Sequence, residues 1–175
     1  MNNAEIINSV NVKELKAYID SCRVDPSKAE RNINLVAKWI GDEHSKVEVG
    51  DKSFEVGNYA KGQVSPMEML LGCLAACDAG VIAEHAALIG LRIESLTVEA
   101  YGHFNVLDYL GLKSEGGAGY DSAKLTFKLN APGVTPEQIA KLTDILESGS
   151  PVGNSFTRKI PVKLEFMGSE MGGDT

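Results

Sequence analysis

The sequence is poor in the residues that build disulfide frameworks and zinc centres. Its 175 residues include only three cysteines and three histidines. An odd number of cysteines disfavours a structural disulfide framework and predicts at least one free thiol. A closed zinc site needs four ligands at characteristic spacings, which these residues do not offer. We therefore expect no metal site, and no motif in the chain predicts a bound cofactor.

Positive charge is scarce as well. The chain has 17 lysines and arginines against 24 acidic residues, a net charge of -7, and no basic run. Such a protein would be repelled by nucleic acid and by anionic membrane surfaces, so neither is an expected partner. The N-terminus lacks the basic region followed by an apolar stretch that marks a secretory signal, which predicts a cytoplasmic location.

The length fits a single domain, residues 1–175. Residues 1–30 are expected to form an N-terminal helical extension, because Asn11 is a suitable N-cap and is followed by apolar residues at helical spacing. The last residues, 168–175, are expected to be frayed.

Strands are predicted in both halves of the chain by their composition or by alternation of apolar and polar residues. They cover residues 32–40, 45–49, 52–56, 94–102, 123–130 and 159–166. The second and third are joined by a two-residue Gly-Asp turn and predict an antiparallel sheet. Pro161 in the last strand favours a sheet edge. A capped helix is predicted over 135–148, with a new turn starting at Ser150.

One long helix dominates the prediction. Ser65 is its N-cap, Pro66 its first residue and Glu68 completes a capping box, while Gly90 ends it. At 1.5 Å per residue the helix is about 35 Å long. It is apolar on nearly every face, so we expect other parts of the protein to surround it.

The interior of this helix suggests what surrounds it. Gly72 and Gly80 are unfavourable inside a helix, which suggests that another backbone passes close by. Asp78, Glu84 and His85 indicate a buried core helix and not a membrane span. The predicted fold is α+β, with antiparallel sheets wrapped around the helix, and a homodimer is the expected way to cover all its faces.

Two cysteines, Cys73 and Cys77, lie one helical turn apart in this helix. A disulfide between them is disfavoured, because residues at this spacing stand about 5 to 6 Å apart and a bridge needs about 3.5 to 4.5 Å between Cβ atoms. For Cys73 we favour simple packing. For Cys77 the residues alone leave packing and a reactive thiol open, since a reactive thiolate needs a nearby cation that the sequence does not reveal.

The motifs around this helix resemble those of the OsmC-like family, which includes the osmotically inducible protein C and organic hydroperoxide resistance branches. Pro66 and Glu68 fit the family's Pro-x-Glu-x-Leu helix start, Cys77 fits its Ala-Ala-Cys motif, and Gly90 fits its closing glycine. Ser150 begins a Ser-Pro-Val where the family carries Cys-Pro-Val, as in a variant branch. The resemblance covers most of the chain after about residue 33.

The resemblance implies an intertwined homodimer in which the long helices are buried between two sheets and the active sites lie at the subunit interface. It also implies thiol peroxidase chemistry. Cys77 would attack the peroxide as a thiolate, and the resulting sulfenic acid would condense with a second cysteine. Glu68 would help to hold an arginine that stabilises the thiolate.

Two departures from the family pattern alter this expectation. Ser150 stands in the place of the second cysteine, and a hydroxyl cannot resolve a sulfenic acid into a disulfide. Residues 41–64, where the family's arginine is expected, contain no arginine; Arg31 and Arg158 lie outside that segment.

The sequence therefore predicts a relative of the thiol-dependent hydroperoxide reductases with one candidate reactive cysteine. It would depend on an external thiol reductant, or it would have lost the activity. The apolar residues around Cys77 favour organic hydroperoxides over hydrogen peroxide. The alternative is a non-redox protein that binds a small apolar molecule in the interface pocket, with Cys77 merely packed.

Overall fold

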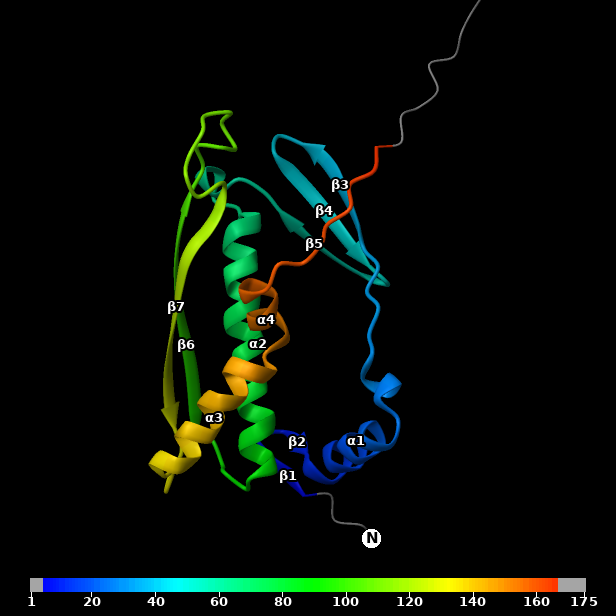
Figure 1. Ribbon diagram of the computed structural model, residues 1–175, viewed down its shortest axis with the longest axis vertical. Helices are drawn as coiled ribbons and strands as arrows, with labels where there is room; N and C mark the ends of the chain where they lie inside the picture. Colours follow the sequence, from blue (N-terminus) through cyan, green and yellow to red (C-terminus); the bar gives the residue numbers. More distant parts are fainter. Residues whose placement is uncertain (1–4, 167–175) are drawn as a thin grey trace, which may run out of the picture.

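A single long helix, α2 (Pro66–Leu88), runs through the middle of the molecule, with sheets and shorter helices placed around it (Figure 1). The computed structural model describes residues 5–166, so the predicted frayed tail at 168–175 lies outside the described residues. The remaining elements are β1 (Ile6–Ile7), β2 (Val10–Asn11), α1 (Val12–Val24), η1 (Pro26–Ala29), β3 (Val36–Gly41), β4 (His44–Val49), β5 (Lys52–Val56), η2 (Tyr59–Lys61), β6 (Ser95–Asn105), β7 (Gly119–Asn130), α3 (Pro136–Gly149) and α4 (Pro151–Thr157).

Both ends of α2 are fixed by local interactions. Ser65 and Glu68 form the predicted capping box, and Gly90 follows the helix with a positive φ of 75°. The β1–β2 hairpin fastens the far end: Asn8 donates from Nδ2 to the carbonyl of Leu91 at 3.1 Å and accepts the Ile93 N–H at 2.8 Å. The β1–β2 hairpin thus holds the chain as it leaves α2.

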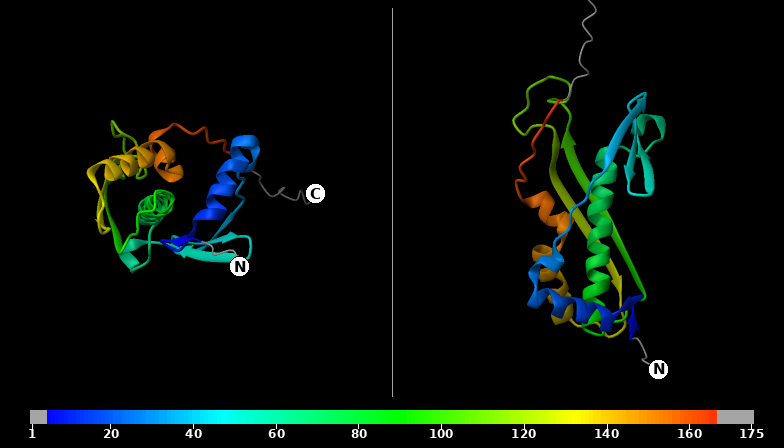
Figure 2. Two further views of the ribbon diagram at one scale, coloured as in Figure 1. Left: turned by 90° about the horizontal axis from the view of Figure 1, so that it is seen from below. Right: turned by 90° about the vertical axis from the view of Figure 1, so that its right-hand side faces the viewer.

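One face of α2 carries the main core. Ile82 and Ala86 pack with Leu91, Ala131 and Leu142, all of them buried. On this side α2 contacts β6, α3 and α4. Viewed from below in Figure 2, the helix lies beside the β6–β7 hairpin and the α3–α4 pair.

The two larger sheets are antiparallel, as predicted. β6 and β7 pair along their whole length, from Ser95 opposite Asn130 to Asn105 opposite Gly119, so both strands run further than the alternation indicated. β3, β4 and β5 form a meander. Val47 in β4 is buried, but several other apolar side chains of this sheet are left open to solvent in one chain, and Trp39 is 76% exposed.

Two of the predictions are wrong for a single copy of the chain. The predicted strand at 159–166 is an extended segment without a sheet partner among the described residues; Pro161 has no N–H to donate, and strand formation requires a neighbouring strand. The long helix is not surrounded either. Its buried line runs through Leu74 and Ile82, whereas Cys73 and Gly80 on the opposite side are exposed.

The close backbone expected beside the helix glycines is also not supplied by the same chain. Among residues 5–166, and apart from the neighbouring backbone of α2 itself, no atom comes within 4 Å of the position that a Cβ would take at Gly72 or Gly80. By length and composition alone α2 could cross a membrane. Its buried Asp78 and its packing against β6, α3 and α4 instead make it the central helix of the domain.

Candidate functional site

The fold brings Ser150 next to Cys77, which lies 73 residues earlier in the chain. The Cys77 Sγ is 3.8 Å from the Ser150 Oγ. Ser150 sits at the corner between α3 and α4, where its hydroxyl caps α4 by accepting the Gly153 N–H at 2.9 Å. Its side chain is almost fully buried, with 1% exposed, while Cys77 is half-buried at the edge of the open face of α2.

Asp78 completes this cluster. The Ser150 hydroxyl donates to Asp78 Oδ1 at 2.5 Å, and the carboxylate is only 7% exposed. Because the single hydroxyl proton of Ser150 is committed to Asp78, the thiol of Cys77 is left as the donor to Ser150. The Cys77 thiol, the Ser150 hydroxyl and the Asp78 carboxylate thus form one hydrogen-bonded chain.

A thiolate at Cys77 would need a compensating cation. Within residues 5–166, no lysine, arginine or histidine forms a hydrogen bond with its sulfur. Arg31 donates to the Tyr18 hydroxyl, and Arg158 donates to the carbonyl of Asn154. The arginine partner implied by the resemblance is therefore not supplied by the described part of one chain.

Glu68 is placed as the capping box requires. Its Oε2 accepts the Ser65 N–H at 2.8 Å, and its own N–H donates to the Ser65 Oγ at 3.2 Å. These hydrogen bonds with Ser65 lower the pKa of Glu68. Nine residues separate it from Cys77, which corresponds to about 13 Å along the helix axis. Glu68 forms no ion pair with another described residue, so the observed geometry assigns it the cap.

Tyr120 and Asp78 also belong to this region, although no motif marks either of them as a site residue. The Tyr120 hydroxyl donates to the carbonyl of Met67 at 2.8 Å, and burial, followed by the charge of Glu68, raises the pKa of Tyr120. The sequence does give a reason to single out Asp78, because a carboxylate in an apolar helix needs a hydrogen-bond donor. Tyr120 follows a glycine-rich connection, and no sequence pattern singles it out.

A large cavity of about 430 Å³ opens at the start of α2, next to η2 and the β6–β7 loop. Its walls are mostly apolar and include Pro66, Met67, Phe104, Val106 and Tyr109. Cys77 is not part of this wall and lies about three helical turns further along α2. In the described residues, no three His, Cys, Asp or Glu side chains gather as a metal site would require.

Comparison with known proteins agrees with this architecture. Residues 59–165 match the family model of OsmC-like proteins. The fold is similar to that of an OsmC-like protein from Mycoplasma pneumoniae, with a TM-score of 0.63 and 16% identity over 73% of this chain and 89% of that chain. An OsmC-like protein of unknown function from Vibrio cholerae has a similar fold, with a TM-score of 0.60. Its sequence is 16% identical, and the match covers 72% of this chain and 94% of that chain.

A third solved structure carries a functional name. The organic hydroperoxide resistance protein OsmC from Legionella pneumophila gives a TM-score of 0.51 and 14% identity over 72% of this chain and 89% of that chain. No curated protein matches the sequence. Because the family model spans more than half of the residues, the chain belongs to the OsmC-like family, which includes hydroperoxide resistance proteins.

Proposed function

We propose that this protein is a one-cysteine hydroperoxide reductase in which Cys77 attacks the peroxide and an external thiol completes the cycle. The observation that carries the proposal is the buried Ser150 hydroxyl 3.8 Å from the Cys77 sulfur. This is the place that the resemblance gives to a second cysteine, and here it holds a group that cannot form a disulfide.

The proposed catalytic cycle needs no second cysteine in the protein. The Cys77 thiolate attacks one oxygen of the hydroperoxide, the O–O bond breaks, and the leaving alkoxide takes a proton to become the alcohol. Cys77 is thereby oxidised to a sulfenic acid. One external thiol converts it to a mixed disulfide and releases water, and a second thiol regenerates Cys77 and leaves as the oxidised disulfide.

A homodimer is part of this proposal. The exposed face of α2 carries small residues at Gly72, Ala76 and Gly80, which permit close approach of another backbone. The segment after α4 presents Val162 and Phe166 to solvent, the latter 98% exposed. A second copy would bury these surfaces and could bring a cation to Cys77. We further propose a cytoplasmic setting, where external thiols are kept reduced.

A second candidate function rests on the large cavity at the start of α2. Its apolar wall fits a small apolar molecule. Within residues 5–166, no basic side chain forms a hydrogen bond with the Cys77 sulfur, which supports this non-redox function. In that case Cys77 would be a packing residue and Met67, Phe104 and Val106 would contact the ligand.

Mass spectrometry distinguishes the two candidates. The intact protein is exposed briefly to near-stoichiometric cumene hydroperoxide with a sulfenic-acid trap, alongside Cys77→Ser and the matched Cys73→Ser. Labelling within seconds that disappears only in Cys77→Ser supports the reductase. Absence of labelling refutes it and directs ligand screening to the large cavity. Faster turnover of cumene hydroperoxide than of hydrogen peroxide is expected; equal or reversed rates argue against the apolar substrate.

A further inference from the structure

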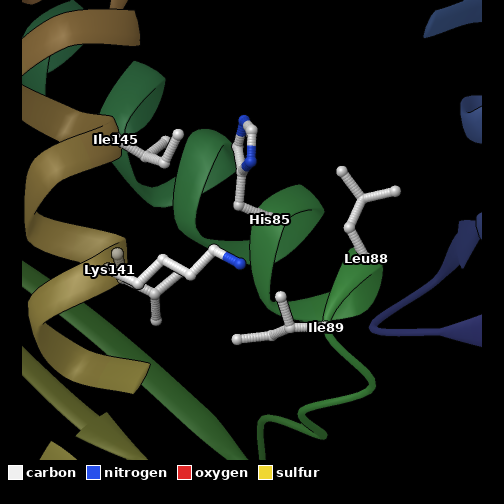
Figure 3. A pocket seen from close by; sticks show the side chains of 6 residues that line it. His85, Leu88, Ile89, Lys141 and Ile145 are labelled. Atoms are coloured by element: carbon white, nitrogen blue, oxygen red, sulfur yellow. The ribbon is translucent and has the colours of Figure 1, made fainter. Parts of the chain in front are cut away.

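A smaller cavity lies between the last turn of α2 and the middle of α3, away from Cys77. Its volume is about 210 Å³. The lining residues are His85, Leu88, Ile89, Lys141, Leu142 and Ile145. Figure 3 shows Lys141 reaching from α3 toward α2, where His85, Leu88 and Ile89 project. An apolar floor thus meets two nitrogen-bearing side chains that come from different helices.

Both polar groups are available to a ligand. Among residues 5–166, neither the Lys141 ammonium nor the His85 ring has a side-chain hydrogen bond or an ion pair. The end of α2 does not use them either. Its last carbonyls accept backbone N–H groups, with Leu91 donating to Ala86 at 2.8 Å and Gly90 donating to Ala87 at 3.0 Å. The cavity therefore offers N–H donors and no acidic side chain in its lining.

We propose that this α2–α3 cavity binds a small aromatic or branched monocarboxylate. The carboxylate would accept hydrogen bonds from Lys141 and His85, because charge-assisted bonds of this kind are the strong ones. The apolar part would rest on Leu88, Ile89 and Ile145. An apolar cavity of about 150 Å³ can hold benzene, so the volume here accommodates a ring with its carboxylate.

Benzoate is the probe, and the neutral, equally shaped benzamide is its control. We expect titration of the full-length protein with benzoate to shift the backbone amide signals of residues 85–89 and 141–145 in NMR spectra. Benzamide should bind at least about tenfold more weakly, as should benzoate to Lys141→Met, since each comparison removes one member of a charge-assisted pair. Lys124→Met, at an exposed lysine of β7, should bind benzoate normally.

A second variant tests the cavity without changing its charge. Leu88→Trp fills the space and should abolish the benzoate shifts while the urea unfolding midpoint confirms that the protein is folded. The proposal is overturned if benzamide binds as well as benzoate, if Lys141→Met binds like the wild type, if the shifts map to the large cavity around Phe104, or if benzoate does not bind. Cys77→Ser should bind benzoate normally, so the outcome is independent of the reductase.

Discussion

Replacing Ser150 by alanine should destabilise the protein far more than removing an ordinary helix cap. The Ser150 hydroxyl caps α4 through the Gly153 N–H and also donates to the buried carboxylate of Asp78. Loss of the cap costs about 1 kcal/mol. Loss of a hydrogen bond to a charged group costs about 1.5 to 3 kcal/mol, because the Asp78 carboxylate would stay buried without a donor. The expected total is about 2.5 to 4 kcal/mol.

The matched control is Thr135→Ala. Thr135 caps α3 through the Gln138 N–H at 3.3 Å, but its surroundings are exposed and it bonds no buried acid. Thr135→Ala should lower the free energy of unfolding by about 1 kcal/mol. The difference between the two variants therefore gives the contribution of the Ser150–Asp78 hydrogen bond, about 1.5 to 3 kcal/mol.

Urea unfolding followed by circular dichroism, at one fixed protein concentration, measures both variants. The double variant Ser150→Ala with Asp78→Ala completes a thermodynamic cycle, and its cost should fall well short of the sum of the single changes. If Ser150→Ala costs no more than Thr135→Ala, the hydrogen bond to Asp78 contributes nothing and the reasoning is refuted.

Ser150→Cys should form a disulfide with Cys77 on mild oxidation, seen as the loss of two hydrogens in the intact mass, because the side-chain atoms already lie 3.8 Å apart; a free-thiol count that stays unchanged would contradict this. The pKa of Glu68 is lowered from 4.5 by its hydrogen bonds with Ser65, so its carboxylate stabilises the protein above that pH and the contribution is lost as pH falls through the folded pKa. Glu68→Gln should therefore be less stable near neutral pH, and its gap from the wild type should narrow in acid; a gap in the urea midpoint that is the same at both pH values would count against the charge. Tyr120 should be the last tyrosine to ionise in an ultraviolet titration, since burial raises its pKa, and Tyr120→Phe should remove that step; an unchanged titration curve would show that another tyrosine is responsible.

The features that could be predicted from the sequence depend on residues close together in the chain. The capping box at Ser65 and the capped helix that starts at Thr135 were predicted because a cap and its partner are three residues apart. The alternation that marks β6 and β7 is equally local. The strand expected at 159–166 was wrong for one chain because alternation indicates a capacity to pair, and pairing requires a second strand that the pattern does not specify.

The site was harder to predict, because its residues lie far apart in the chain. Cys77 and Ser150 were singled out through the family resemblance, and only the fold shows that they are neighbours. Asp78 in an apolar helix indicates that a buried hydrogen-bond donor lies nearby, but only the fold identifies that donor as Ser150. Tyr120 contacts the start of α2 through a backbone carbonyl, which any residue could provide.

One face of α2 is open to solvent, and no basic side chain of the described residues bonds the Cys77 sulfur. The two facts are connected, because Cys77 lies at the edge of that open face. Leu74 and Asp78 face α4 and the core, whereas Cys73 and Gly80 face outward, and Cys77 lies at the border between the two sides. Any group that covers the open side also changes the dielectric and the charge around Cys77. The proposed homodimer and the proposed chemistry are therefore linked, because a second copy that brought a cation to this face would supply the partner that a reactive thiolate needs. The reactivity of Cys77, measured above and below the dimer dissociation constant, consequently reports on both.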